Sequence, residues 1–223
     1  NGKRQIITKG AVEEMLSICS YAEFGGEVRP LVKDIRVRAQ KFVEEMNNQG
    51  MRVLALAHKS FLSKENNFAV EDEQEMVLIG YLAFLDPPKA SAAQAIRQLH
   101  EHGVEVKVLS GDNDAVVKTI SRQVGIETST AVTGPELEKM SEEDKMKAVA
   151  MGNIFSKLTP MQKVEIIQLL RKQKNTVGFL GDGINDAAAL RESDIGISVD
   201  SAVDIAKESA DIILLEKDLM VLE

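Results

Sequence analysis

The sequence predicts an α/β protein in which a parallel sheet flanked by helices follows a smaller α+β segment. Three observations indicate this class. Beyond residue 89, short apolar runs alternate with helical patterns, which is typical of a parallel sheet covered by helices. Two consecutive prolines, Pro87 and Pro88, separate this part from the segment before it. The composition, with 44% hydrophobic and 4% aromatic residues and no Trp, provides an aliphatic core.

The first segment, residues 1–82, is interpreted as an α+β unit. The polar stretch 60–74 predicts a loop. The prolines at 87 and 88 fix φ and remove two backbone donors, so they end the last strand of the segment. We therefore place a domain boundary beside them and assign residues 83–223 to a second domain. Within the first segment the apolar patterns predict strands at 5–8, 52–57 and 76–85 and helices at 11–19 and 34–48.

Residues 83–223 repeat the order of strand and helix. Ser91 is expected to cap a first helix that Gly103 closes. Thr159 is expected to cap a later helix with Pro160 at its first position, where a missing N–H costs nothing. In parallel sheets of this kind, chemistry gathers at the C-terminal ends of the strands. The remaining pattern predicts strands at 104–109, 176–180, 195–199 and 212–215 and helices at 114–124, 133–150, 185–192 and 203–209.

Composition and charge exclude several classes of protein. With 27 basic and 35 acidic residues, the net charge of −8 argues against a nucleic-acid partner. Cys19 is the single cysteine, so no internal disulfide forms and a reducing compartment is expected. No apolar run approaches the roughly 20 residues that span a bilayer, and no signal peptide opens the chain. Because the sequence begins at Asn1 and not at Met, we expect it to be a piece of a longer protein.

Polar side chains follow two of the predicted strands. Strand 104–109 leads into Ser-Gly-Asp-Asn at 110–113, and strand 176–180 leads into Gly-Asp-Gly-Ile-Asn-Asp at 181–186. Free N–H groups at a helix start favour an anion such as phosphate, and a hard ion such as Mg²⁺ prefers one or two carboxylates with phosphate oxygens. Lys163, one turn into the helix after Thr159, would neutralise charge during phosphoryl transfer. The alternatives are a plain turn with an N-cap, a Ca²⁺ loop and a solvated lysine.

Five motifs carry a resemblance to a known family. Residues 181–190 (GDGINDAAAL) resemble the TGDGxNDxPAL hinge signature of P-type cation-transporting ATPases. Lys-Gly-Ala at 9–11 resembles their KGA, Asp-Pro-Pro at 86–88 their DPP, and Ser-Gly-Asp at 110–112 their TGD. Thr159-Pro160 with Lys163 resembles the region of their conserved lysine. The five motifs occur in the family's order, and the run 194–219 is most similar to the bacterial magnesium-importing branch.

The resemblance implies a fold and an activity. It implies a haloacid-dehalogenase-like, Rossmann-type phosphorylation domain lacking its first strand, preceded by the C-terminal part of a nucleotide-binding domain. The intact protein would be an ATP-driven cation transporter, with Mg²⁺ the expected ion, that forms an aspartyl-phosphate. It would lie in the cell membrane with this soluble part on the cytoplasmic side, joined to N-terminal, actuator and transmembrane parts. ATP is the implied substrate and Mg²⁺ the implied cofactor.

The resemblance also implies roles for individual residues. Asp182 would bind Mg²⁺ with Asp186 as a second acid, and Lys163 would pair with the phosphoaspartate and the γ-phosphate. The transferred phosphoryl group would be held by Ser110, Gly111 and Asn185. The nucleotide would be contacted by Lys9, Gly10, Arg52, Asp112 and Lys157.

The sequence departs from the family pattern at several positions. Ser110 replaces the usual Thr, Ala188 the usual Pro, and Lys157 an Arg, which loses the bidentate fork. No DKTGT occurs, so the acceptor aspartate and its central strand are expected upstream. In the family that strand lies between the strands placed here at 104–109 and 176–180. We expect the gap to be filled by residues 5–8, by collapse of the flanking strands or, preferably, by a strand swapped within a dimer.

Two other functions stay open from the sequence. A soluble phosphatase of the haloacid-dehalogenase type shares the phosphorylation-domain fold. Two features argue against it: the KGA segment, and the missing aspartate nucleophile, which a complete phosphatase must contain. A non-catalytic nucleotide- or ion-sensing module fits the 223 residues taken alone. The coding sequence upstream of Asn1 separates these readings, because DKTGT there supports the transporter and a start codon supports the module. The three histidines do not form a metal-ligand pattern.

Overall fold

The fold is taken from a computed structural model that describes residues 4–61, 69–216 and 218–222. The chain divides into two compact units, Asn1–Asp86 and Pro87–Glu223. Of the loop predicted at 60–74, residues 62–68 lie outside the described residues, residues 60 and 61 instead end a strand, and a 3-10 helix, η1, follows at Val70–Asp72. In the described parts of the chain, no helix is both long and apolar enough to cross a membrane.

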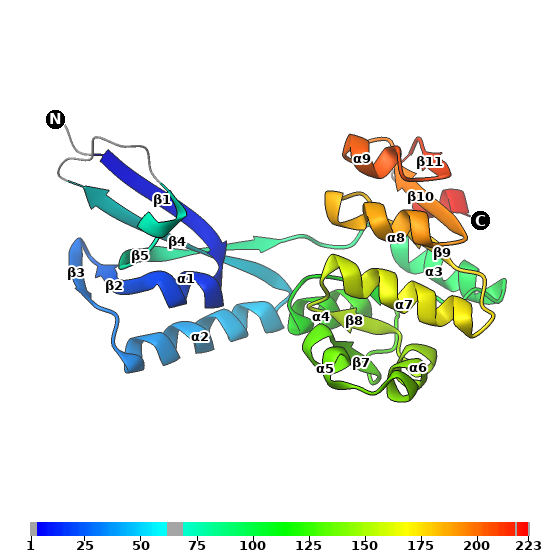
Figure 1. Ribbon diagram of the computed structural model, residues 1–223, viewed down its shortest axis with the longest axis horizontal. Coiled ribbons are helices and arrows are strands. Elements are labelled where there is room, and N and C mark those ends of the chain that lie inside the picture. The colour runs from blue at the N-terminus through cyan, green and yellow to red at the C-terminus, as the bar shows by residue number, and fades with distance from the viewer. Residues whose placement is uncertain (1–3, 62–68, 217, 223) are drawn as a thin grey trace. The chain divides into compact units, whose positions relative to one another are not determined.

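The first unit is a five-stranded sheet in the order β1-β4-β5-β2-β3 (Figure 1). All neighbouring strands are antiparallel except β2 and β5, which are parallel. The bounds are β1 Arg4–Ala11, α1 Val12–Ile18, β2 Cys19–Phe24, β3 Glu27–Pro30, α2 Lys33–Asn48, β4 Met51–Phe61 and β5 Met76–Leu85.

One face of this sheet is covered by helices and the other is open. Alternate residues of a strand point to opposite faces, and Val53, Ala55 and Ala57 of β4 are buried in one core with residues of α1 and α2. Leu82 and Phe84 of the adjacent strand β5 point to the opposite face of the sheet, and they are 44% and 48% exposed. The first unit therefore presents an open, partly apolar sheet face.

Most predicted elements of the first unit are confirmed, but the hairpin of β2 and β3 was missed. Cys19, expected at the end of a helix, instead begins β2. Gly25 and Gly26 form the two-residue turn with φ of 59° and 87°, because the turn types that match strand twist need positive φ. The Gly-Gly pair between short apolar runs was the signal that could have found this hairpin.

Arg36 of α2 ties the start of the first unit together. Its guanidinium donates hydrogen bonds to the backbone carbonyls of Leu16, Cys19 and Leu31. These carbonyls lie at the end of α1 and beside β2 and β3, so one side chain connects three segments.

Burial raises the pKa of the Cys19 thiol to about 11, and the thiol therefore stays protonated at neutral pH.

The second unit contains two three-stranded parallel sheets, in the orders β6-β8-β7 and β11-β10-β9. Its helices are α3 Ala92–Glu101, α4 Asp114–Gln123, α5 Gly134–Lys139, α6 Glu142–Met151, α7 Pro160–Lys172, α8 Ala187–Glu192 and α9 Asp204–Lys207. Two 3-10 helices are η2 Ile184–Asp186 and η3 Leu219–Leu222. The strands are β6 Val108–Leu109, β7 Ala131–Thr133, β8 Ile154–Ser156, β9 Gly178–Leu180, β10 Ile195–Val199 and β11 Ile212–Leu214.

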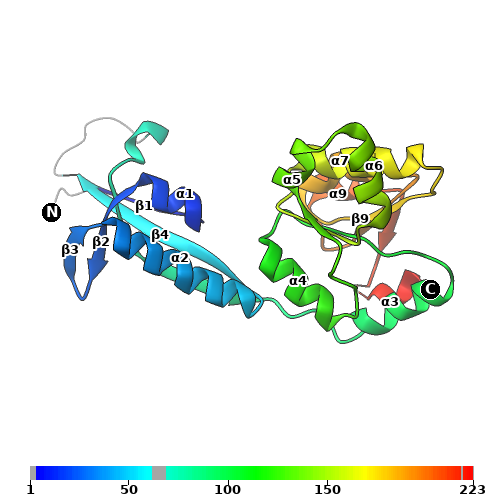
Figure 2. The ribbon, with the colours of Figure 1, turned by 90° about the horizontal axis from the view of Figure 1, so that it is seen from below.

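Helix α7 packs against both sheets. Ile166 and Leu169 are buried in the core around β8, whereas Val164 and Ile167 are buried in the core around β9 and α8. Figure 1 shows α7 in yellow with β7, β8 and α6 on one side and α8, β9 and β10 on the other. A third core lies under α3 and α4, where η3 packs against α3 near the C-terminus (Figure 2).

The expected filling of a gap in the sheet by residues 5–8 is wrong. These residues belong to β1, which pairs with β4 in the first unit. Among the described residues, β6 pairs only with β8 and β9 only with β10, so each is the edge of its own sheet. The strand expected at 104–109 is found only at Val108–Leu109, which pair with Ile154 and Phe155 of β8.

The helix expected at 133–150 is two helices, each with its own cap. Thr133 and Glu136 form a capping box at α5, and Ser141 accepts the amide N–H of Asp144 at α6. The capping box at α7, where Thr159 accepts the amide of Gln162 at 3.3 Å, confirms the prediction for Thr159. Ser91 precedes α3 but makes no side-chain cap, since its own backbone is already helical.

Candidate functional site

Two turns of the second unit carry most of the predicted site residues, and the first follows β6. The Ser110 amide donates to the Phe155 carbonyl at 2.9 Å, and the Ser110 carbonyl accepts from the Leu158 amide at 3.0 Å. The Lys157 amide donates to the Asp112 carbonyl at 2.9 Å. The turn after β6 is therefore joined by backbone hydrogen bonds to the turn between β8 and α7.

Side chains and a glycine complete this first turn. The Ser110 hydroxyl accepts from the Asp112 amide at 3.1 Å and donates to the Asp112 carboxylate at 3.2 Å. A Cβ on Gly111 would lie 3.3 Å from the Leu158 carbonyl oxygen, so the close backbone approach favours glycine. The exposed Gly111 backbone leaves this turn accessible to a ligand.

Lys157 has a left-handed backbone, with φ of 51°. Non-glycine residues rarely adopt this conformation, and such strain clusters at binding and catalytic sites. Gly134 packs directly on it, because a Cβ at Gly134 would lie 2.4 Å from the Lys157 carbonyl oxygen and 2.6 Å from Gln162 Oε1. The side chain of Lys157 is exposed beside the turn that contains Ser110.

Gly134→Ala is expected to destabilise the second unit by about 1–3 kcal/mol, because the added methyl group must displace the Lys157 backbone as well as the Gln162 side chain. Denaturant unfolding of the variant measures this loss. Gly178→Ala is the matched control, since a Cβ there would lie 3.9 Å from its nearest neighbour, the Ile195 carbonyl oxygen. Equal stability of the two variants would contradict the packing of Gly134 on Lys157.

The second turn, residues 181–186, follows β9 and is ordered around Asp186. The Asp186 carboxylate accepts from the Gly183 amide at 3.1 Å with one oxygen and from Lys163 Nζ at 2.7 Å with the other. The side chains of Lys163 and Asp186 are each 13% exposed. A Cβ on Gly181 would lie 2.6 Å from the Cβ of Asp186, so this glycine is required by close approach.

The start of α7 brings the two turns together. Leu158, just before the helix, is bonded to Ser110 of the first turn, and Lys163, in the first turns of α7, is bonded to Asp186 of the second. The ion pair of Lys163 and Asp186 was not predicted, and no sequence signal marks it, since 23 residues separate the partners. Sequence reasoning had placed both residues in the site but with separate partners.

The acids of the second turn differ in their availability to a cation. Both oxygens of Asp186 are engaged, whereas Asp182 and Asn185 are exposed. In the described ranges, no three His, Cys, Asp or Glu side chains gather into a metal cluster. One open carboxylate beside an amide fits Mg²⁺ held partly by phosphate oxygens and water, and the donor set agrees with that ion.

The remaining predicted residues lie on the sheet of the first unit. Lys9 pairs with Leu56 and Arg52 with Phe84, which puts both cationic residues on the open face. Gly10 pairs with Ala55, and its missing Cβ would lie 3.3 Å from the sulfur of Met15 in α1. Gly10 therefore faces the helices, on the opposite side of the strand from the Lys9 side chain.

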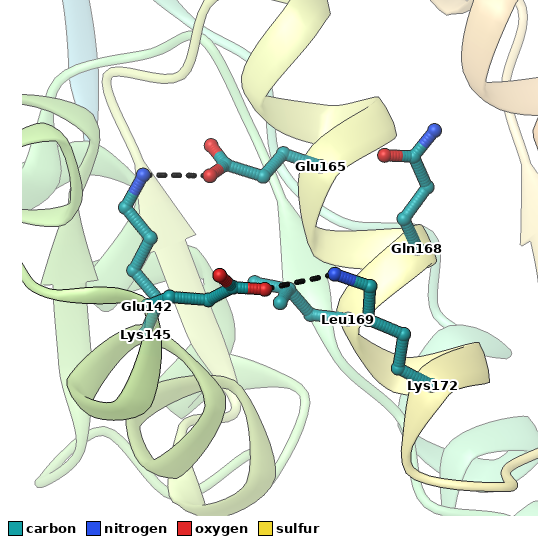
Figure 3. A pocket seen from close by; sticks show the side chains of 6 residues that line it. All are labelled: Glu142, Lys145, Glu165, Gln168, Leu169 and Lys172. Carbon is teal, nitrogen blue, oxygen red and sulfur yellow. Dashed lines mark hydrogen bonds and ion pairs between the residues drawn. The ribbon is translucent and has the colours of Figure 1, made fainter.

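A polar cavity of about 290 Å³ lies between α6 and α7 (Figure 3). Two ion pairs cross it, Lys145 to Glu165 at 2.6 Å and Lys172 to Glu142 at 2.9 Å. Each charged group at its rim is thus already neutralised by a partner on the other helix. None of the predicted site residues lines this cavity, whose walls are Glu142, Lys145, Glu165, Gln168, Leu169 and Lys172.

Comparisons with known proteins agree with the motifs. Residues 1–91 match the family model described as P-type ATPase, cytoplasmic domain N. Magnesium-transporting ATPase, P-type 1, of Salmonella typhimurium is 51% identical over 225 residues, which cover 100% of this chain and 25% of the relative. The protein of the same name from Escherichia coli is 46% identical over 220 residues, covering 98% and 24%.

A calcium-transporting ATPase of Listeria monocytogenes is 32% identical over 222 residues, covering 99% of this chain and 25% of the relative. The chain thus spans about a quarter of the length of the curated relatives that it matches. Identity is higher to the two magnesium-transporting relatives than to the calcium-transporting one. Because its five motifs occur in the family's order and because it is similar to these proteins along almost all of its own length, the chain belongs to the P-type cation-transporting ATPase family.

Proposed function

We propose that the intact protein is an ATP-driven cation transporter, with Mg²⁺ as the transported ion, and that this chain supplies part of its catalytic machinery. The first unit would be the C-terminal part of the nucleotide-binding domain. The second would be most of a haloacid-dehalogenase-type phosphorylation domain. The names of the magnesium-transporting relatives and their identity of 46–51% support the ion.

One observation carries the proposal: the start of α7 joins the turns that follow β6 and β9. Leu158 holds the first turn through Ser110, and Lys163 holds the second through Asp186. Both turns lie at C-terminal ends of parallel strands, where such sheets place their chemistry. This arrangement gathers a cation, two carboxylates and exposed backbone amides, which phosphoryl transfer requires.

The residues would divide the work as follows. Asp182 would hold the catalytic Mg²⁺, with Asp186 fixing Lys163. Bound there, Mg²⁺ would neutralise charge that develops on the phosphoryl oxygens. The phosphoryl group itself would be oriented by Ser110, the Gly111 amide and Asn185.

The nucleotide would lie against the open face of the first unit. Lys9 and Arg52 provide positive charge there, beside apolar side chains on which a base can stack. Gly10 would contribute through its backbone, since its Cβ position faces α1. Asp112 and Lys157 would meet the ribose and phosphates, and the left-handed backbone of Lys157 supports a functional role.

The acceptor aspartate would come from a strand upstream of this chain. The edges of β6 and β9, which have no strand partner among the described residues, favour insertion of such a strand. In isolation, a strand swapped from a second copy would satisfy the same edges, and light scattering that reports a dimer would support that arrangement. The intact protein would reside in the cell membrane, with this part on the cytoplasmic side and with actuator and transmembrane parts as its partners.

Phosphorylation by labelled ATP tests the proposal. The intact protein is expected to form an acid-stable, hydroxylamine-sensitive phosphoenzyme, whereas the 223-residue chain alone is expected to show neither labelling nor ATP hydrolysis. The reason is that a covalent step needs its nucleophile, and no DKTGT occurs in this sequence. Acid gels of both samples give the answer. Stable labelling of the chain alone, or an unlabelled intact protein, would contradict the assignment.

A further inference from the structure

A buried serine on β10 is bonded to the turn that carries Asp182. Ser198 is fully buried, with 0% of its surface exposed. Its hydroxyl donates a 2.8 Å hydrogen bond to the carbonyl oxygen of Gly181. Its neighbours along the strand, Ile197 and Val199, are apolar, so a hydroxyl at this position is a polar exception in an aliphatic sheet.

The bond from Ser198 completes a set that fixes both sides of the Gly181 residue. The Gly181 amide donates to the Ile197 carbonyl at 3.1 Å, and the Asp182 carbonyl accepts from the Val203 amide at 3.2 Å. The Gly181 carbonyl belongs to the same peptide plane as the Asp182 amide. A donor on that carbonyl therefore sets the orientation of the backbone from which the Asp182 side chain projects.

The need for this bond follows from the glycine itself. Position 181 excludes a Cβ, because one would lie 2.6 Å from the Cβ of Asp186. Glycine, however, has access to many more backbone conformations than other residues. The hydrogen bond from the Ser198 hydroxyl therefore restricts the conformation of a peptide in which glycine alone would allow many.

We propose that Ser198 is a positioning residue for Asp182, acting through the Gly181 carbonyl. This inference rests on the proposed function, in which Asp182 holds the catalytic Mg²⁺. Without the hydroxyl, the Gly181 carbonyl loses its buried donor, and the peptide before Asp182 is held only by the backbone bonds on either side of it. The carboxylate is then no longer held in one direction, and the apparent affinity for Mg²⁺ falls.

The test compares Ser198→Ala with a matched control, Ser209→Ala. Ser209 is also buried, at 8% exposure, and its hydroxyl donates to the Ile205 carbonyl at 2.7 Å and accepts from Arg191 at 3.1 Å, so its hydrogen bonds lie outside the turn 181–186. In the intact protein, Ser198→Ala is expected to raise the Mg²⁺ concentration for half-maximal phosphorylation about three- to tenfold, the equivalent of one ordinary hydrogen bond. Ser209→Ala is expected to leave that concentration unchanged, and Ser198→Thr, which keeps the hydroxyl, to restore it.

A second readout does not depend on activity. In the ¹⁵N-labelled 223-residue chain, Ser198→Ala is expected to move the amide resonances of Asp182 and Val203, and to weaken their response to added Mg²⁺ by a similar factor. Ser209→Ala should leave both resonances in place. Thermal unfolding of each variant confirms that it is folded before the comparison is made.

The outcomes separate the two ideas. If Asp182→Asn still forms phosphoenzyme at the normal rate, the proposed role of Asp182 fails. If Asp182→Asn is inactive but Ser198→Ala leaves both the Mg²⁺ dependence and the Asp182 resonance unaltered, the positioning role is overturned while the proposed function stands. Equal shifts in Ser198→Ala and Ser209→Ala would also overturn it, since loss of any buried hydroxyl would then suffice.

Discussion

Asp182→Asn in the intact protein is expected to abolish phosphoenzyme formation while leaving the second unit folded. The replacement keeps the size of the side chain but removes the one open carboxylate of the turn, since both oxygens of Asp186 are already engaged. Loss of metal-assisted charge stabilisation costs several kcal/mol in the transition state, so labelling by ATP should fall below detection. Rapid acid quench with labelled ATP measures it.

A matched acid controls for the change in net charge. Asp200 is exposed, directly follows β10 and has no assigned role. Asp200→Asn is therefore expected to phosphorylate at the normal rate, and circular dichroism should report the same fold for both variants. A labelling rate for Asp182→Asn within a few-fold of that of Asp200→Asn would remove Asp182 from the site.

Lys163→Ala is expected to lower the free energy of unfolding of the second unit by about 3 kcal/mol. The lysine and Asp186 are each 13% exposed and 2.7 Å apart, and removing one member of a buried pair leaves an uncompensated charge, which costs about 3–5 kcal/mol. In the intact protein the same change should also slow phosphorylation by about 2–4 kcal/mol in activation free energy. Denaturant unfolding measures the first effect and quench kinetics the second.

Two further variants isolate the cause of that loss. Lys172, on the same helix, pairs with Glu142 across the cavity, but the two side chains are 59% and 73% exposed. Lys172→Ala should therefore cost less than about 1 kcal/mol. Lys163→Met combined with Asp186→Asn removes both charges and should recover much of the stability. If Lys163→Ala and Lys172→Ala cost the same, the pair of Lys163 and Asp186 is not buried in solution.

Local sequence signals predicted the elements that have local causes. The capping box at Thr159 and the prolines after β5 act within a few residues, and both are found where they were expected. The bounds of β5, Met76–Leu85, agree with the predicted strand. The family motifs pointed to the two turns of the candidate site because the residues of each turn are contiguous in the sequence.

Features set by distant partners could not be predicted in this way. Strand β6 pairs with β8, which lies more than 40 residues further along the chain. The bond between Lys163 and Asp186, and that between Ser198 and Gly181, join separate elements without any shared pattern. Gly10 belongs to a recognised motif, yet only the register of β1 against β4 reveals which face of the sheet it occupies.

The two-faced packing of α7 makes the two sheets of the second unit one cooperative body. Opening the sheet at β8 would strip Ile166 and Leu169 of their partners, and opening the sheet at β9 would do the same to Val164 and Ile167. Both sets of side chains belong to one helix. Loss of the contacts on one side of α7 therefore also weakens the packing on its other side, and we expect the two sheets to unfold together. The start of the same helix is bonded to both turns of the candidate site. The two turns therefore keep their positions relative to each other as long as the two sheets stay folded.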